Sequence, residues 1–346
     1  MPLLATLATL GVVLNHATWQ VLGNIKPPAL SGYAYLPLDQ VGKLAIPAFM
    51  FIAGYFAAYA TSGGRKPLPW TVVYARITRL FWPWVLWSAI WLGGQVIIGA
   101  RSINVHEVLL TLFSQYYFIP MLMTYTLLAP AMTALARRSI RSLLMLSALL
   151  QVLAVALFYL QISGLITTVP EWVDLLPLQY LRFAFYFPFG LTVGMNPAAF
   201  SPLLRWRKAL PWFTLLAYGL AILEGSLAFQ RGGFDWQRAD SHVKSTSMLI
   251  SLGALCYFMV YEHVPIPQRL GKTVRDMSAN TYGIYLSHYL VVGSLDRLLA
   301  RFLPQPLPIW MGWAYVLLLT VGTLAVCLQM IQFSTRFKRI HQYLFG

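Results

Sequence analysis

The chain has 346 residues, of which 58% are hydrophobic and only 10% are charged. Soluble domains contain about 25% charged residues, so this composition excludes an ordinary water-soluble protein and indicates that lipid is the solvent for much of the chain. The net charge of +15 does not indicate nucleic-acid binding, because the Lys and Arg residues form short clusters between long uncharged stretches.

Ten stretches of the sequence are long and apolar enough to cross a membrane as helices, which need about 20 mostly apolar residues. We therefore predict an all-α bundle of about ten transmembrane helices that forms a single domain over residues 1–346. The loops are too short for a second domain, so function is expected to lie in the membrane bundle and its loops. The predicted spans are residues 2–22, 44–61, 80–99, 108–131, 142–163, 180–197, 209–229, 246–262, 278–295 and 309–332.

The basic residues between the spans predict the orientation of the chain. Sixteen Lys and Arg residues fall in one alternating set of connecting and terminal segments, and eight fall in the other set. Basic residues accumulate on the cytoplasmic side, so the first set is predicted to be cytoplasmic, with both termini inside. This set comprises residues 62–79, 132–141, 198–208, 263–277 and 333–346.

Histidines inside the predicted spans are candidates for function, because ionisable side chains are costly in a membrane. His16 follows Asn15 in the outer half of the first span. Histidine is suited to proton transfer near neutral pH, although a structural hydrogen-bonding role for His16 is equally open. Tyr282, Tyr285 and His288 are three residues apart and share one helix face, which fits either a cavity or a helix-packing network.

Charged residues at four further positions are also candidates for function. Arg182 interrupts the sixth span and Glu224 the seventh, either as an ion pair between helices or near the outer interface, where long side chains reach water. Arg76 and Arg79 precede the third span and are spaced to share one helix face. Two guanidinium groups there would form a clamp for phosphate groups, or would anchor the span to the cytoplasmic surface.

The two cysteines, Cys256 and Cys327, both lie in apolar stretches. We predict that they are small buried hydrophobic residues. Neither belongs to a CxxC motif or a Cys/His cluster, so no metal site is indicated.

Six motifs, taken in chain order, resemble the acyltransferase-3 family of membrane acyltransferases. The resemblance runs through most of the chain, and it depends on the order of the motifs more than on any one of them. They are LATLGVVLNHA (7–17), IPAFMFIAGYF (46–56), RITRLFWP (76–83), FSQYYFIP (113–120), RFAFYFPFGLTVG (182–194) and SANTYGIYLSH (278–288).

The resemblance implies an enzyme that moves an acyl group, commonly acetyl, from a cytoplasmic acyl-coenzyme A to a hydroxyl of a surface polysaccharide or lipid-linked glycan. It favours a bacterial plasma membrane. His16 is implied as the catalytic base, and Arg76 and Arg79 as contacts to the phosphates of coenzyme A. The residues expected to line the substrate cavity are Asn15, Arg182, Glu224, Tyr282, Tyr285 and His288.

The sequence departs from the family pattern at two positions. The family usually has an Arg eleven residues before the first-helix His, where this chain has Ala5, and Ala53 replaces the Ser of a Ser-Gly-Phe motif. Another Arg could substitute, the motif could be relaxed, or the protein could be catalytically weak. An inactive relative that serves as a partner in surface-glycan assembly is a further alternative. A glycan or lipid transporter is the alternative from another class, because interior His, Glu and Arg residues would also suit it.

Overall fold

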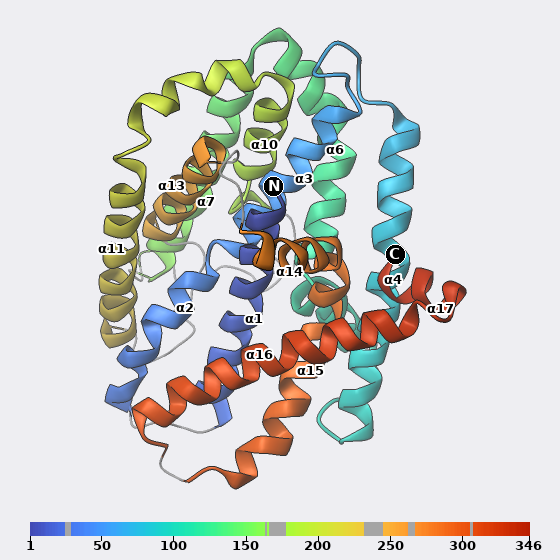
Figure 1. The fold of residues 1–346 in the computed structure, drawn as a ribbon, viewed down its shortest axis with the longest axis vertical. Coiled ribbons are helices and arrows are strands. Elements are labelled where there is room, and N and C mark those ends of the chain that lie inside the picture. Colours follow the sequence, from blue (N-terminus) through green and yellow to red (C-terminus); the bar gives the residue numbers. More distant parts are fainter. Residues whose placement is uncertain (25–28, 163–164, 166–177, 232–244, 262–266, 305–306) are drawn as a thin grey trace. The chain divides into compact units, whose positions relative to one another are not determined.

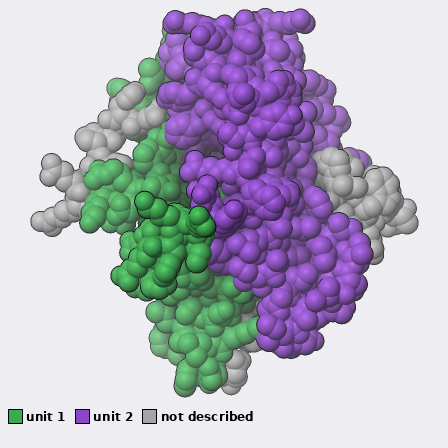
Figure 2. All heavy atoms as spheres, turned by 90° about the vertical axis from the view of Figure 1, so that its right-hand side faces the viewer, with its two compact units in different colours: residues 1–48, 203–341 green, residues 49–202, 342–346 purple. Residues whose placement is uncertain are grey.

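The computed structural model of the chain describes residues 1–24, 29–162, 165, 178–231, 245–261, 267–304 and 307–346. The regular elements of these residues are all helices, as the sequence predicts (Figure 1). A helix satisfies its backbone hydrogen bonds within one segment, as the interior of a membrane requires. The described chain forms two compact units, residues 1–48 with 203–341 and residues 49–202 with 342–346 (Figure 2).

Six helices among the described residues are long and apolar enough to cross a membrane, and they match six of the ten predicted spans. The other four predicted spans, residues 2–22, 180–197, 246–262 and 278–295, are largely helical but are not among these six. The number of spans and the orientation therefore stay predictions. The six are Gly32–Tyr59, Trp70–Ile97, Phe118–Arg138, Ile140–Leu160, Leu210–Gln230 and Ile309–Ser334.

The first unit contains α1 (Pro2–Asn24), which packs against α15 (Thr281–Leu299) and α16 (Ile309–Ser334). Tyr315 of α16 donates a hydrogen bond to Oδ1 of the buried Asp296 on α15 over 2.8 Å, which satisfies a carboxylate inside the packed helices. The shared core consists of Ala17, Val21, Tyr35, Val292, Leu307, Tyr315, Val316 and Leu319.

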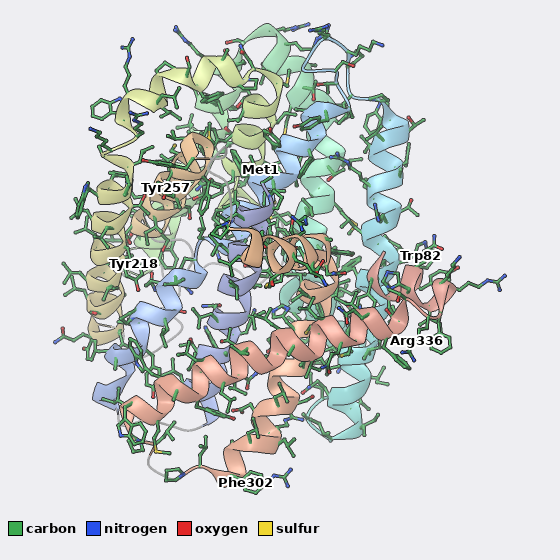
Figure 3. The ribbon with its side chains drawn as sticks, in the orientation of Figure 1. Met1, Trp82, Tyr218, Tyr257, Phe302 and Arg336 are labelled. Atoms are coloured by element: carbon green, nitrogen blue, oxygen red, sulfur yellow. The ribbon has the colours of Figure 1, made fainter. Side chains whose placement is uncertain are left out.

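Short helices join the remaining parts of this unit. Tyr218 lies on the long helix α11 (Figure 3). Its hydroxyl donates to the carbonyl oxygen of Pro37 on α2 over 2.7 Å. The elements are η1 (Ala29–Tyr35), α2 (Leu36–Gly42), α11 (Leu210–Arg231), α13 (Ser245–Tyr261), α14 (Gln268–Ala279) and η4 (Ala300–Phe302). The sequence analysis assigned η1, α2 and most of α14 to loops, because they are too short or too polar to register as apolar spans.

In the second unit, α3 and α10 approach so closely that only glycine fits between them. A Cβ added to Gly54 would overlap the carbonyl oxygen of Phe187, and one added to Gly190 would overlap that of Phe51. The unit comprises most of α3 (Ala45–Tyr59), α4 (Trp70–Ile97), α5 (Val105–Leu110), the π-helical turn η2 (Thr111–Gln115), α6 (Phe118–Arg138), α7 (Ile140–Ile162), α9 (Leu178–Leu181) and α10 (Tyr186–Met195). The elements η3 (Pro197–Trp206) and α17 (Lys338–Phe345) each have residues in both units.

Helix α4 begins ten residues before the third predicted span. Its start follows Pro69, which has an extended backbone with φ −70° and ψ 139°. Pro67 and Pro69 keep the residues before them out of the helical conformation, and the helix begins as soon as they end. Arg76 and Arg79 therefore lie inside α4, on a helix as their spacing predicts, and the helix begins earlier than the predicted span.

The sixth predicted span is not one continuous helix. A turn over residues 182–185 separates α9 from α10. Pro188 is the third residue of α10, where the missing N–H removes no helical hydrogen bond, so the helix restarts just before it. Arg182 lies in this turn, and the prediction that it lies inside a helix is wrong.

Candidate active site

Two histidines from distant parts of the sequence meet in the first unit. His16 lies in α1 and His288 in α15, and their ring centroids are 5.0 Å apart. The two helices are neighbours because both contribute apolar side chains to the core that includes α16. His16 is half-buried, whereas His288 is only 2% exposed. The pair therefore combines one partly accessible imidazole with one that water does not reach.

Two backbone carbonyls fix the tautomer of His288. Its Nδ1 lies 2.6 Å from the carbonyl oxygen of Tyr285 and 3.2 Å from that of Ile284. A carbonyl oxygen only accepts, so Nδ1 carries a proton and, in the neutral ring, Nε2 carries a lone pair. This Nε2 is buried and has no hydrogen-bond partner among the residues that the structure describes. An unpaired buried polar atom is costly, so its retention points to a functional role.

Aromatic side chains of α15 surround the two histidines. Tyr289 meets His16 edge-on, with 5.1 Å between the ring centroids. The Tyr285 ring lies 5.5 Å from that of His288, and Tyr282 is half-buried in the first turn of the helix. The structure thus brings together the predicted His16, Tyr285 and His288. It adds Tyr289, which the sequence analysis did not single out.

A buried polar network adjoins His16 through the preceding residue. Asn15 Nδ2 donates to Oδ1 of Asp39 over 2.6 Å, and Lys43 Nζ donates to the same oxygen over 3.0 Å. Gln40 Nε2 donates to the other oxygen, Oδ2, over 2.6 Å. The exposed fraction of Asp39 is 0% and that of Lys43 is 1%. A carboxylate is tolerated at such depth only with partners of this kind, so the network fixes α2 against the His16 region of α1.

Lys43 is one of the eight basic residues of the second set of predicted segments, and its ammonium group is buried against Asp39 rather than exposed in a loop. The four-residue spacing of Asp39 and Lys43 was the available signal, because it is typical of an ion pair on a helix. Gly42 permits the burial: a Cβ there would overlap the side chain of Asn15 and the carbonyl oxygen of Gly11. The close approach of α2 to α1 is visible only in the structure.

The two arginines of α4 both make hydrogen bonds within the second unit. Arg76 is half-buried, and its Nη2 donates to the carbonyl oxygen of Phe56 in the last turn of α3 over 2.9 Å. Arg79 is exposed, and its Nη2 donates to the backbone oxygen of Gly346 over 3.3 Å. A guanidinium group has five N–H donors, so one such bond leaves donors for a phosphate.

Glu224 and Arg182 lie in different units. Glu224 on α11 accepts hydrogen bonds from the backbone nitrogen and the hydroxyl of Thr246, in the first turn of α13. A carboxylate at a helix N-terminus pairs with free N–H groups and with the helix dipole, so Glu224 links α11 to α13. Arg182 is half-buried in the turn before α10, where the backbone nitrogen of Phe185 donates to Oε1 of Gln151 over 2.9 Å.

Comparison with known protein families matches residues 3–331, nearly the whole chain, to the acyltransferase domain of the acyltransferase-3 family. The chain belongs to this family. Comparison with curated proteins and with solved structures gives no match. Membership of the acyltransferase-3 family, together with the six apolar helices, indicates a membrane acyltransferase.

In this member of the acyltransferase-3 family, Ala5 occupies the position at which the resemblance implies an arginine. Ala5 is buried in α1, and α14 packs against this part of the helix. Thr6 Oγ1 donates to the carbonyl oxygen of Val274 over 3.0 Å. The next residue of α14, Arg275, is exposed. The two cysteines, Cys256 and Cys327, are buried and free, as the sequence predicts.

Proposed function

We propose that the protein is a membrane O-acyltransferase that moves an acyl group from a cytoplasmic acyl-coenzyme A to a hydroxyl of a surface or lipid-linked glycan. Acetyl is the default acyl group, and a bacterial plasma membrane is the proposed location. The observation that carries the proposal is the His16–His288 pair, in which a buried Nε2 lone pair lies beside a half-exposed imidazole. A neutral imidazole lone pair beside a second, accessible imidazole is suited to accepting or relaying a proton.

The proposed reaction breaks the thioester C–S bond and forms an ester C–O bond. The acceptor hydroxyl attacks the carbonyl carbon while His16 takes the hydroxyl proton, and the coenzyme leaves as a thiolate that recovers one proton. A thioester is already activated, so the protein has mainly to orient the acceptor and remove its proton as attack proceeds. His288, with its tautomer fixed by Tyr285, would assist by passing on the proton that His16 takes.

The coenzyme carries several phosphate charges, and Arg76 and Arg79 are the proposed contacts for them. Both guanidinium groups already make bonds to backbone oxygens, which limits their rotamers before a ligand arrives. Such preorganisation lowers the entropy lost on binding. No metal takes part in the proposed reaction.

The test measures acetyl-coenzyme A binding and slow hydrolysis by the purified protein in detergent. We expect that Arg76→Ala/Arg79→Ala abolishes saturable binding, and that His16→Ala abolishes hydrolysis while binding persists. Matched controls are Arg205→Ala/Arg207→Ala and His106→Ala, which remove exposed side chains. These controls should leave binding and hydrolysis unchanged.

Absence of binding by the folded parent protein would overturn the coenzyme-dependent reaction and favour a transporter. Binding without any turnover would favour an inactive relative, the reading that Ala5 in place of the family arginine supports.

A further inference from the structure

We propose that a groove formed by α6, α7 and the α9–α10 segment holds one acyl chain of an anionic phospholipid, with the lipid phosphate at the arginines of the α6–α7 turn. The inference is independent of the acyl-transfer chemistry. The groove has a volume of about 330 Å³ and lies wholly within the second unit. Ligand pockets have volumes of about 300–1,000 Å³, so the groove can enclose part of a lipid.

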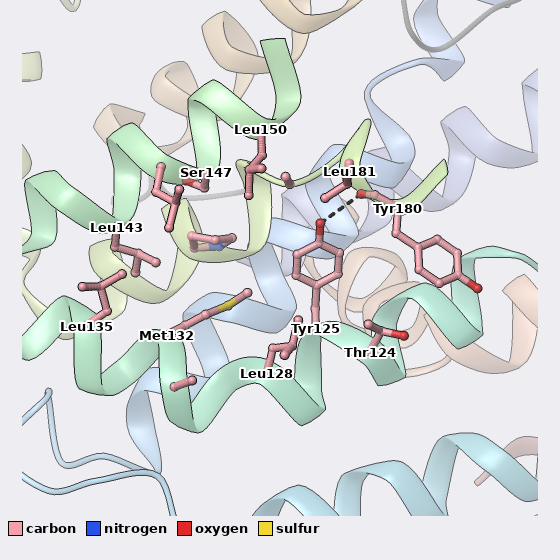
Figure 4. Close-up of a pocket in the computed structure, with 14 residues that line it drawn as sticks. Thr124, Tyr125, Leu128, Met132, Leu135, Leu143, Ser147, Leu150, Tyr180 and Leu181 are labelled. Carbon is pink, nitrogen blue, oxygen red and sulfur yellow. Dashed lines mark hydrogen bonds between the residues drawn. The ribbon is translucent and has the colours of Figure 1, made fainter. Parts of the chain in front are cut away.

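The groove is lined mainly by aliphatic side chains (Figure 4). It opens at the surface. Leu128 and Leu146 line it and are 46% and 49% exposed, so a chain can enter from the side. Its other aliphatic lining includes Met132, Leu135, Leu143 and Leu150.

Three of the hydroxyl groups that line the groove donate hydrogen bonds to backbone carbonyl oxygens. Tyr125 donates to the carbonyl oxygen of Tyr180 over 2.9 Å, as the dashed line in Figure 4 marks. Thr124 donates to the carbonyl oxygen of Pro120 over 2.9 Å, and Ser147 to that of Leu144 over 3.1 Å. A ligand with polar groups would find little to bind here, whereas a hydrocarbon chain would lose only its contact with lipid.

The length of the groove suits one leaflet of a bilayer. It extends along α6 from Thr124 to Leu135, which at ~1.5 Å per residue is ~16 Å. One leaflet contributes half of a hydrocarbon core of ~30 Å, or ~15 Å. A chain that runs the length of the groove would therefore place its headgroup beyond Leu135 and Leu143, which lie together at one end in Figure 4.

Three arginines lie just beyond that end. Arg137 and Arg138 complete α6, and Arg141 is in the first turn of α7. All three are exposed, and none has a neighbouring acid within the sequence 130–150. Guanidinium groups bind phosphate with paired hydrogen bonds, and clustered Arg residues at a membrane surface attract anionic lipids. This charge, at the end of an apolar groove of leaflet length, selects an anionic phospholipid.

The test uses the full-length protein in phosphatidylcholine nanodiscs that contain a phosphatidylglycerol probe with a diazirine on one acyl chain. After illumination, peptide mapping should place the label on residues 124–150 and 180–188. Ala131→Trp, which fills the groove from the exposed side of α6, should remove most of this label. Ala134→Trp changes an exposed alanine one turn away that does not line the groove, and it should leave the label unchanged.

The headgroup contact is tested with the variant Arg137→Gln/Arg138→Gln/Arg141→Gln. Its labelling should fall by roughly tenfold or more, to the level of an equivalent phosphatidylcholine probe. The matched control is Arg205→Gln/Arg207→Gln/Lys208→Gln, a second exposed basic cluster. A competition experiment on the parent protein does not depend on the folding of any variant. Unlabelled phosphatidylglycerol should lower the labelling of the parent protein by the probe. Equal labelling by both probes, or competition by a polyprenyl phosphate but not by phosphatidylglycerol, would overturn the proposal.

Discussion

The imidazole rings of His16 and His288 lie 5.0 Å apart, centroid to centroid, although the first is near the start of the chain and the second is in α15. Their proximity depends on the packing of α1 against α15, and the tautomer of His288 depends on the carbonyl oxygen of Tyr285. Proton transfer needs both the proximity of the rings and the fixed tautomer, because a base must lie close to the group that gives up the proton and must present a lone pair to it.

Replacing His288 with asparagine separates its structural role from its chemical one. In His288→Asn, the side-chain amide still offers an N–H near the position of Nδ1, but the Nε2 lone pair is lost. We expect acetyl-coenzyme A hydrolysis to fall by about 10²-fold or more, the usual contribution of a general acid or base, while the Kd for acetyl-coenzyme A is unchanged.

The matched control for this variant is His106→Asn, at an exposed position in α5. The measurement is single-turnover hydrolysis together with equilibrium binding. A folded His288→Asn variant that hydrolyses at the parent rate would show that His288 only packs the helices.

The sequence was sufficient to predict long helices and interior histidines, and it was insufficient for the network around Asp39. Apolar runs of about 20 residues identify membrane helices because lipid excludes other backbone conformations. His16 and His288 stood out because polar residues are rare in such runs. The seven-residue helix α2 is too short for this signal, so Asp39 and Lys43 read as loop residues although both are fully buried.

The break at Arg182 shows a second limit of sequence reasoning. The average apolarity of residues 180–197 predicts one helix, but Pro188 and the hydrogen bond from Phe185 to Gln151 decide where the helix begins. That bond joins α7 to a segment 34 residues further along the chain. A partner at this separation cannot be inferred from local composition.

The buried pair of Asp39 and Lys43 should be tested by its effect on stability. Lys43→Met leaves the Asp39 carboxylate buried without its cation, and breaking one partner of such a pair costs about 3–5 kcal/mol. Asp39→Asn/Lys43→Met should recover part of this loss, because no isolated charge remains. The measurement is the free energy of unfolding in detergent.

Lys66→Met, at an exposed position, is the control and should change the free energy of unfolding by less than about 0.5 kcal/mol. If Lys43→Met had the same small effect as Lys66→Met, the network would not hold α2 against α1.

Glycine residues between α3 and α10 offer a test of the packing in the second unit. In Gly190→Ala, the new Cβ would overlap the carbonyl oxygen of Phe51, and separating the two backbones should cost about 1–3 kcal/mol. Small residues allow close approach of helices in membranes, so Gly54→Ala should have a similar cost.

Gly219→Ala is the matched control, because Gly219 lies inside α11 and a Cβ added there would meet no atom of a neighbouring element within 4 Å. This change should stabilise the protein by up to about 1 kcal/mol, the difference in helix propensity between Gly and Ala. Thermal unfolding of the three variants should therefore separate them by sign. Stabilisation by Gly190→Ala would contradict the close approach of the two helices.

Arg76 and Arg79 should differ in what their loss does to the protein, even though both are proposed to bind the donor. Arg79 is exposed, so Arg79→Gln should raise the Kd for acetyl-coenzyme A by roughly tenfold or more, as expected for the loss of a charge-assisted hydrogen bond, with little change in stability. Arg76 is half-buried and bonded to Phe56, so Arg76→Gln should weaken binding and also lower the unfolding temperature. Arg79→Lys should restore only part of the affinity, because an ammonium group cannot form the paired hydrogen bonds of a guanidinium group.

Isothermal titration with acetyl-coenzyme A, and with coenzyme A lacking the 3′-phosphate, identifies the phosphate that each arginine contacts. Unchanged affinity in both Gln variants would place the donor site elsewhere on the basic side of the bundle.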